Sequence, residues 1–326
     1  PVLFTATHTH SGPGAAMRGL VARAFGGSYR REVERRIVAA MIRAVETAGR
    51  ATRPVRIRHG HAEVPALVRN RTRSESAGYP SVDSRLDLVL LEDEEGSRLS
   101  VLRFSAHPTI LSASNMEFSA GYPGFLREAV ARRLGGQAMY LAGSLGSMSP
   151  VPPEAGDEYE SARAYAQALA RALPPAEQLE EVQPDTLSVA ELVADGPPVQ
   201  LRVAPWLRLS PVFLRLNGVT RSVRMTAIGL GDLVFLGFPG DFSGELGAAL
   251  RARHAPEISL LPMSFSGAYL GYISPDAYYD ELYDDGGLAY ETGIMSWTGP
   301  HQERFFVSVA GAMIEAVRGE AGNRRQ

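Results

Sequence analysis

The chain has 326 residues, enough to bury a large core as one big domain or two smaller ones. Its formal net charge of −3 gives no electrostatic reason to expect a nucleic-acid partner, because such proteins usually carry a basic patch. No apolar run approaches the roughly 18 residues that a membrane-spanning helix needs. All 33 basic residues are arginine and cysteine is absent, which excludes lysine Schiff bases, thiol nucleophiles and cysteine-bound metals. Any metal must be held by His, Asp, Glu or Tyr.

The first half of the chain alternates between apolar strands and amphipathic helices. In chain order, the spacing predicts a buried strand over residues 2–7, a helix over 28–50, a strand over 54–64, a polar loop over 69–84, strands over 86–91 and 99–106, a helix over 124–134, a strand over 138–142, a polar loop over 150–158 and a helix over 159–173. The helix over 28–50 is the clearest, because apolar residues recur on one face and Arg and Glu on the other.

The second half begins with a Pro-punctuated stretch, residues 174–220, which we expect to form a small β excursion over the site. Further along, the pattern predicts strands over 222–230 and 232–238 joined by a hairpin turn, a helix over 243–253, a strand over 258–264, a polar loop over 268–300 and a helix over 301–318. This order predicts one α/β domain over residues 1–326, with mixed sheets flanked by helices. Because the chain runs from Pro1 directly into a strand, we also expect an upstream segment.

Polar residues that could bind a metal or take part in catalysis follow several of the predicted strands. His8 and His10 end the first strand, and His107, Ser149 and Asp241 each follow a later apolar run. Ligands collect at the C-terminal ends of strands in open α/β sheets, so these residues are expected to share one site.

His8 and His10 are two residues apart, so both side chains should point to the same face of a strand. Such a pair can ligate zinc with one imidazole and keep the other beside it as a donor or base, although two polar histidines at a strand end would look the same. His59 and His61 repeat the spacing, but arginines and a glutamate flank them and no Gly/Pro turn follows. We interpret that second pair as a solvated face.

Three further residues could complete a site around the two histidines. His107 precedes Pro108 and is a plausible third metal ligand, or a hydrogen-bonded structural histidine. Asp241 either caps the helix that follows it or completes a His/His/carboxylate site, with Glu245 as the reserve carboxylate. Ser149 lies in a serine-rich turn that is not the Gly-x-Ser-x-Gly elbow of the α/β-hydrolases.

Taken in order, these segments resemble the signatures of the neutral/alkaline (non-lysosomal) ceramidases, in their N-terminal catalytic domain. Residues 7–14 are similar to the family's THTHSGPG signature. The other matches are Asn70-Arg71 to Asn-Arg-Ser, residues 104–109 to F-x-x-H-P-T, 145–150 to L-G-D-V-S-P, 239–243 to P-G-E-F-T, 272–274 to Y-x-T-T, and 290–291 with 297–300 to Y-E-(G/A)…G-P. The resemblance is collinear from residue 1 to about residue 310 and points to a short, divergent bacterial-type member.

This resemblance implies a zinc-dependent amidase of sphingolipid metabolism that hydrolyses an N-acyl bond, in ceramide or in a related N-acyl lipid or amine. It implies Zn²⁺ on four residues, namely His8, His107, Asp241 and Tyr272. It also implies that the amide is lined by His10, Arg71 and Tyr290, with Ser149 as the catalytic serine. By the same resemblance we expect secretion or a periplasmic location and peripheral contact with a membrane, while the sequence leaves the oligomeric state open.

Departures from the family pattern narrow these expectations. The family's metal-binding Glu is Asp241 here, and the Asp two residues before the serine is Ser147. The region between Ser149 and Asp241 is short, so the ceramide assignment is weaker than the metallo-amidase assignment. One alternative is a catalytically impaired relative that binds lipid or glycan in the same cleft. Another is an amidohydrolase barrel, which the absence of Lys disfavours.

Overall fold

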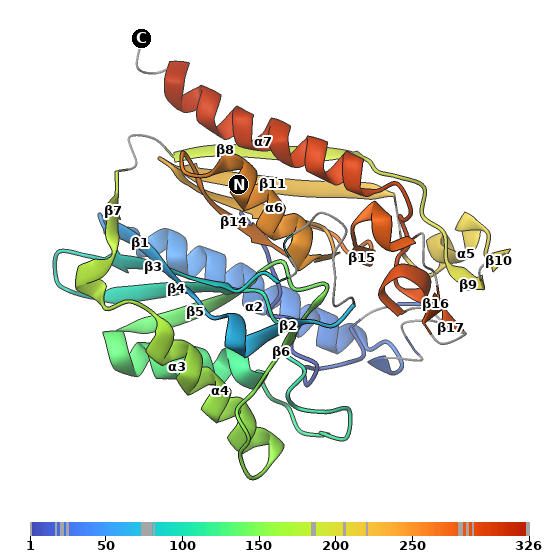
Figure 1. Ribbon diagram of the computed structural model, residues 1–326, viewed down its shortest axis with the longest axis horizontal. Coiled ribbons are helices and arrows are strands. Elements are labelled where there is room, and N and C mark those ends of the chain that lie inside the picture. The colour runs from blue at the N-terminus through green and yellow to red at the C-terminus, as the bar shows by residue number, and fades with distance from the viewer. Residues whose placement is uncertain are drawn as a thin grey trace.

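The computed structural model describes residues 2–16, 18–19, 23, 26–72, 80, 82–183, 187–204, 207–219, 221–279, 283–284, 287–288 and 290–323. Two sheets stack face to face, with a pair of helices on the outside of each, as Figure 1 shows. This layered arrangement agrees with the predicted mixed α/β class and rules out the barrel alternative.

The first sheet has the strand order β5-β4-β3-β1-β7, in which only β4 and β5 run parallel. Its strands are β1 (Arg56–Glu63), β3 (Arg85–Glu92), β4 (Arg98–Phe104), β5 (Gln137–Ala142) and β7 (Glu180–Val182). Successive side chains of a strand point to opposite faces, so Leu86, Leu88 and Leu90 of β3 all face one side. There they meet α3 (Gly121–Leu134) and α4 (Glu158–Ala172) in a buried apolar cluster.

The second sheet has the order β14-β12-β11-β8, in which only β12 and β14 run parallel. Its strands are β8 (Leu187–Asp195), β11 (Ser222–Leu230), β12 (Leu233–Gly237) and β14 (Ser259–Met263). The outer face is covered by α6 (Gly244–His254) and α7 (Glu303–Asn323), and Leu250, Phe306 and Ile314 of these helices are buried there. The remaining elements are α2 (Arg31–Arg50), β2 (Val68–Asn70), β6 (Met148–Pro150), β9 (Arg202–Ala204), β10 (Leu207–Arg208), α5 (Pro211–Leu216), β13 (Asp241–Phe242), β15 (Tyr272–Ile273), β16 (Tyr283–Asp284), β17 (Gly287–Leu288) and the short turns η1 (Pro65–Leu67), η2 (Ala176–Gln178), η3 (Asp276–Tyr279) and η4 (Tyr290–Ile294).

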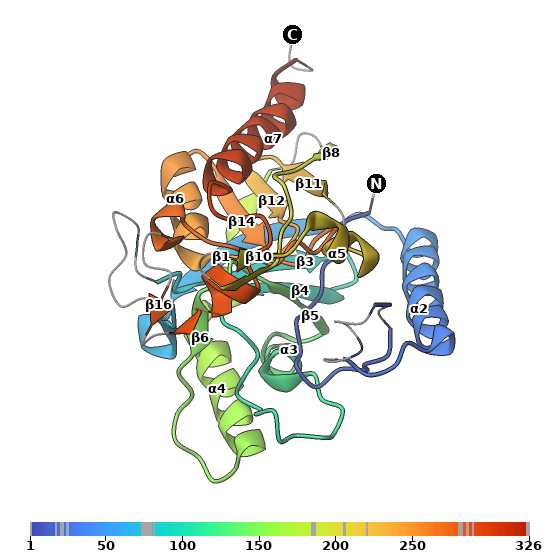
Figure 2. The ribbon, with the colours of Figure 1, turned by 90° about the vertical axis from the view of Figure 1, so that its right-hand side faces the viewer.

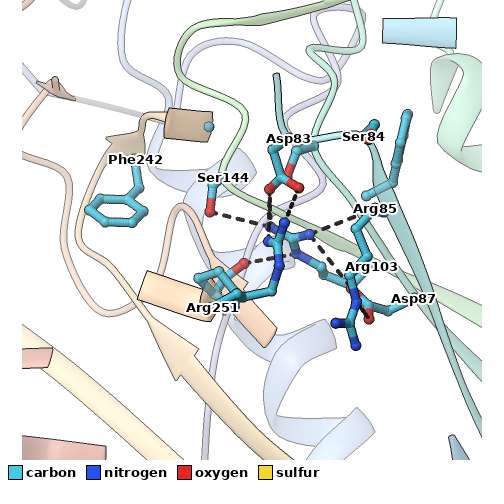
Figure 3. A network of polar contacts seen from close by, with 12 residues as sticks. Asp83, Ser84, Arg85, Asp87, Arg103, Ser144, Phe242 and Arg251 are labelled. Atoms are coloured by element: carbon cyan, nitrogen blue, oxygen red, sulfur yellow. Dashed lines mark hydrogen bonds and ion pairs between the residues drawn. The ribbon is translucent and has the colours of Figure 1, made fainter. Parts of the chain in front are cut away.

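The layer between the sheets contains apolar side chains and one buried charged network. Val89, Val101 and Leu261 belong to the apolar part. Arg103 of β4 is fully buried and donates to the carboxylate of Asp83 at 2.7 Å and to the carbonyl of Pro262 at 3.0 Å. Arg251 of α6 reaches the same carboxylate, so one network ties the first sheet to the second sheet and its helix (Figure 3).

Most predicted elements lie within a few residues of their observed bounds, but the first one does not. Residues 2–7 were expected to form a buried strand; instead they make only an isolated bridge from Thr5 to Ser266, and Val2 and Phe4 are exposed. The predicted excursion at 174–220 is largely built into the sheets, because β7 pairs with β1 and β8 pairs with β11. Among the described elements of this stretch, η2, β9, β10 and α5 lie outside the two sheets.

The predicted helix over 28–50 is present as α2, but its apolar face is not covered by the part of the chain that the structure describes. None of its residues is buried, and Figure 2 shows the helix at the periphery of the molecule. Among the described helices, none combines the length and hydropathy that crossing a bilayer requires.

Candidate metal centre and active site

His107 and Asp241 come from two sheets and meet beside a loop at the start of the chain. His107 lies just past the end of β4, where its backbone N–H bonds the carbonyl of Met148. Asp241 forms β13, which pairs in parallel with β15 so that Asp241 lies opposite Tyr272. His8 completes the group from a left-handed backbone conformation (φ 60°), with its ring stacked on Phe265 at 4.1 Å between centroids.

The potential ligand atoms of these three residues lie within 4.8 Å of one another. Nε2 of His107 is 3.3 Å from Oδ1 of Asp241, and Nε2 of His8 is 3.7 Å from the same oxygen. Two ligands at about 2.0–2.1 Å from a tetrahedral zinc ion stand roughly 3.3–3.4 Å apart, so the spacing suits zinc. This is the only such group of His, Asp and Glu among the described residues.

The hydrogen bonds around the group leave ligand lone pairs facing inward. Nδ1 of His107 lies 2.6 Å from the carbonyl of Leu145, so it carries the proton and Nε2 is free to accept. Oδ2 of Asp241 accepts a hydrogen bond from Tyr269 at 2.7 Å. Oδ1 is buried and has no hydrogen-bond donor among the described residues. A buried acceptor beside two imidazole nitrogens is an arrangement that a cation would satisfy.

Burial also keeps the imidazoles neutral, which metal binding requires. Desolvation lowers the pKa of His8 to about 3, despite the opposing charge of Asp241. Desolvation, followed by the charge of Arg71, lowers the pKa of the fully buried His107 and also that of His10, whose exposed ring is only partly desolvated by its neighbours. Burial raises the pKa of Asp241, and the opposing effects of His8, of the hydrogen bond from Tyr269 and of the Arg71 charge do not offset it.

Tyr272 and Arg71 stand at the edge of the metal group. The Tyr272 hydroxyl is 3.3 Å from Nε2 of His107, and the Arg71 guanidinium donates to that hydroxyl at 2.8 Å and to His107 Nε2 at 3.1 Å. Nε of Arg71 in turn lies 3.0 Å from the carboxylate of Glu291. The structure therefore brings Tyr272 and Arg71 to the cluster, as the resemblance implied, and adds Glu291 as the partner of the arginine.

The other expected site residues occupy the rim or lie outside the cluster. His10 is exposed, with Nε2 3.1 Å from Nε2 of His8, and the half-exposed Tyr290 packs edge-on to Tyr272 at 5.9 Å. Ser149 lies in β6 opposite Arg69 and lines a cavity of about 410 Å³ together with Thr109. No hydrogen bond joins its hydroxyl to the cluster within the described part of the chain.

Two sequence-level interpretations need correction. Glu245, the reserve carboxylate, is not part of the metal group; it is buried and accepts from Asn70, Ser147 and Tyr278 instead. His59 is not on a solvated face, because it is buried with Nε2 3.3 Å from Asp87, whereas its neighbour His61 is exposed.

Sequence reasoning did not identify Tyr269, Phe265 or the carbonyl of Leu145. Tyr269 lies three residues before the matched segment 272–274, and Glu291 was part of a quoted motif without being given a role. Backbone carbonyls and aromatic packing leave no motif of their own, so only the tertiary structure identifies these partners.

Sequence comparisons match less than half of this chain to neutral ceramidases. Residues 1–138 match the family described as neutral/alkaline non-lysosomal ceramidase, N-terminal. A neutral ceramidase of Mycobacterium tuberculosis is 30% identical over 150 residues, which cover 43% of this chain and 23% of that protein. A neutral ceramidase of Pseudomonas aeruginosa is 25% identical over 161 residues, covering 46% of this chain and 24% of that protein.

Solved structures extend the likeness over nearly the whole chain. The crystal structure of neutral ceramidase from Pseudomonas aeruginosa superposes with a TM-score of 0.81 at 20% identity, covering 98% of this chain and 61% of the other. A ceramidase complexed with C2 gives the same TM-score at 19% identity, covering 98% of this chain and 62% of the other. These matches confirm the fold and the resemblance to the neutral/alkaline ceramidases, while the chain spans about three fifths of those structures and matches about a quarter of the curated relatives.

Proposed function

We propose that this chain is the catalytic part of a zinc-dependent hydrolase that cleaves the N-acyl amide bond of ceramide or of a related N-acyl lipid or amine. The observation that carries the proposal is the unpartnered, buried Oδ1 of Asp241 facing Nε2 of His8 and of His107. These three residues and Tyr272 would hold the metal. The shared fold with neutral ceramidase of Pseudomonas aeruginosa supports the reaction class.

When bound, zinc would supply Lewis-acid polarisation of the amide carbonyl or a water of lowered pKa. The chain supplies a cation of its own beside that position. Arg71 donates to Tyr272, and its Nε faces the carboxylate of Glu291. With zinc on Nε2 of His107, the N–H that now points to that nitrogen would be released and could bind the substrate's carbonyl oxygen as negative charge develops there.

The rim residues can orient the amide. His10 is neutral at pH 7, because burial and Arg71 lower its pKa, and one of its ring nitrogens can therefore donate while the other accepts. Tyr290 adds a hydroxyl next to Tyr272. Ser149 opens onto the cavity that Thr109 also lines, from which its hydroxyl would attack or position the substrate.

The test is metal analysis combined with hydrolysis of ceramide and of a short-chain N-acyl amine by the purified chain. We expect about one zinc per chain and release of the free fatty acid. His107→Ala should lose the zinc and slow hydrolysis by about a thousandfold or more, because the barrier reduction supplied by a metal is several kcal/mol. His61→Ala is the matched control, since this exposed histidine on β1 lies outside the metal group.

A protein that folds without binding zinc and cleaves neither substrate would contradict the proposal. The alternative of an impaired relative that binds lipid or glycan is favoured by two observations. Ser147 stands in place of the family's Asp, and no hydrogen bond links the Ser149 hydroxyl to the cluster among the described residues. Stoichiometric zinc without hydrolysis, together with saturable binding of the same ceramide, would support this binding protein over the hydrolase.

A further inference from the structure

Glu245 is a fully buried carboxylate on the first turn of α6, four residues after Asp241. It forms no ion pair with any described Arg or His, and three neutral groups donate to it. Oε1 accepts from the side-chain amide of Asn70 and from the hydroxyl of Tyr278, and Oε2 accepts from the hydroxyl of Ser147. Three hydrogen bonds from separate segments converge on this one side chain, so it links those segments into one polar network.

Two of these donors flank the backbone of Arg71. Asn70 immediately precedes Arg71, and its side-chain oxygen accepts from the backbone N–H of Thr72 at 2.9 Å. The backbone N–H of Arg71 itself donates to the carbonyl of Ser147 at 2.8 Å. Glu245 therefore accepts hydrogen bonds from both segments next to Arg71, through Asn70 and Ser147. Arg71 extends from this turn to His107 and Tyr272.

The same anchor fixes the short ribbon of β2 and β6. In this ribbon Asn70 pairs with Met148 and Arg69 pairs with Ser149. Ser147 precedes β6 and accepts from the backbone N–H of Gly244 at 3.0 Å, so it also ties the ribbon to the start of α6. Tyr278, the third donor, lies in η3 shortly after Tyr272. Glu245 thus joins the segments that present Arg71, Ser149, Asp241 and Tyr272.

The hydroxyl of Ser147 stands where the family pattern L-G-D-V-S-P has a carboxylate, and Glu245 reaches that hydroxyl from α6. We infer that Glu245 is a positioning residue for the reaction, a carboxylate moved from position 147 to the neighbouring helix, which holds the Arg71 turn and the Ser149 ribbon against the metal group. This inference rests on the proposed amidase function for its catalytic consequence, but its structural content can be measured without activity.

The experiment compares three variants of the full chain, namely Glu245→Gln, Glu245→Ala, and Glu245→Ala combined with Ser147→Asp. Hydrogen exchange of residues 68–72 and 146–150, zinc content, Tm, kcat and KM are measured for each. Glu245→Gln should raise exchange in these segments about tenfold and lower kcat about tenfold, with zinc content and KM within twofold of the parent, because the metal ligands are untouched. Its Tm should fall by about 5 °C.

The variant that combines Glu245→Ala with Ser147→Asp is the decisive test. It places a carboxylate at position 147, and the shortened side chain at position 245 leaves room for it. It should recover exchange protection and most of kcat relative to Glu245→Ala alone.

Asp93→Ala is the stability control. Asp93 caps the turn after β3 through the backbone N–H groups of Glu95 and Ser97, so its loss should lower Tm without changing hydrogen exchange of the β2–β6 ribbon. Parental exchange in Glu245→Gln and Glu245→Ala, or no recovery in the combined variant, would overturn the inference. If the parent cleaves no amide, the proposed function fails, and the exchange and Tm measurements still decide on the anchor.

Discussion

The network around Asp83 and the cluster around Asp241 both bury a carboxylate completely, yet only the first supplies it with cationic partners. Burial alone would raise the pKa of Asp83, but Arg103 and Arg251 hold that pKa well below its usual range. For Asp241 burial prevails and the pKa rises. The same desolvation therefore gives opposite outcomes, according to whether arginine side chains contact the carboxylate directly.

The comparison separates structural from functional burial of charge. Asp83 lies between the two sheets, where its ion pairs join β4 to α6 (Figure 3). Asp241 lies where strands end, and its Oδ1 accepts no hydrogen bond from the described residues, so it is available to a bound ligand such as a metal ion. A buried carboxylate that is fully paired stabilises the fold as it stands, whereas one left unpaired is a candidate for ligand binding.

The largest effect on stability is expected from Asp83→Asn. Removing this charge leaves the buried Arg251 without its carboxylate partner and leaves Arg103 only the longer 3.6 Å contact with Asp87, which should lower the free energy of unfolding by about 3–5 kcal/mol. Urea unfolding measures it, with Glu257→Gln as the control, because Glu257 forms an exposed pair with Arg318 whose loss should cost less than about 1 kcal/mol. Equal effects of the two substitutions would contradict the structural role of the network.

A smaller, pH-dependent effect is expected from Asp87, which faces the same layer. Burial opposes ionisation, but a hydrogen bond from His59 and the charges of Arg85 and Arg103 lower its pKa to about 2. Because this value lies below the ordinary 3.8, the stabilisation is complete above about pH 4 and is lost as the pH falls toward 2. The difference in unfolding free energy between the parent and Asp87→Asn should shrink by about 2 kcal/mol over that window. A constant difference would show that Asp87 is not the titrating group.

The smallest effect on stability is expected from Asp241→Asn in metal-free protein. The substitution removes a desolvated charge that forms no ion pair with any described arginine, and the amide oxygen can still accept from Tyr269, so the free energy of unfolding should change by no more than about 1 kcal/mol. Zinc binding, measured by titration against a chelator, should be lost in the same variant. If metal-free Asp241→Asn were as unstable as Asp83→Asn, the proposed difference between the two clusters would be wrong.

Much of the fold could be predicted because strand and helix periods are local properties of the sequence. The apolar runs of β3 and β4 and the apolar spacing in α3 and α4 are visible without tertiary contacts. The strand predicted over residues 2–7 was wrong because the prediction used local properties alone. An apolar run indicates burial, but a strand also needs a partner strand, and among these residues only Thr5 forms a bridge. Likewise, the apolar face of α2 was evident, but its exposure was not.

The sequence by itself determined which residue types could carry metal chemistry. With no Cys and no Lys, the ordered histidines His8, His10 and His107 and the carboxylate of Asp241 stood out through motifs that are short and local. Only the tertiary structure decided that Asp241 rather than Glu245 faces the histidines, that Leu145 sets the tautomer of His107, and that Glu245 anchors Arg71 instead. These contacts depend on the direction in which side chains from distant segments point. Asp241 and Glu245 are only four residues apart, yet the first faces the histidines and the second faces Asn70.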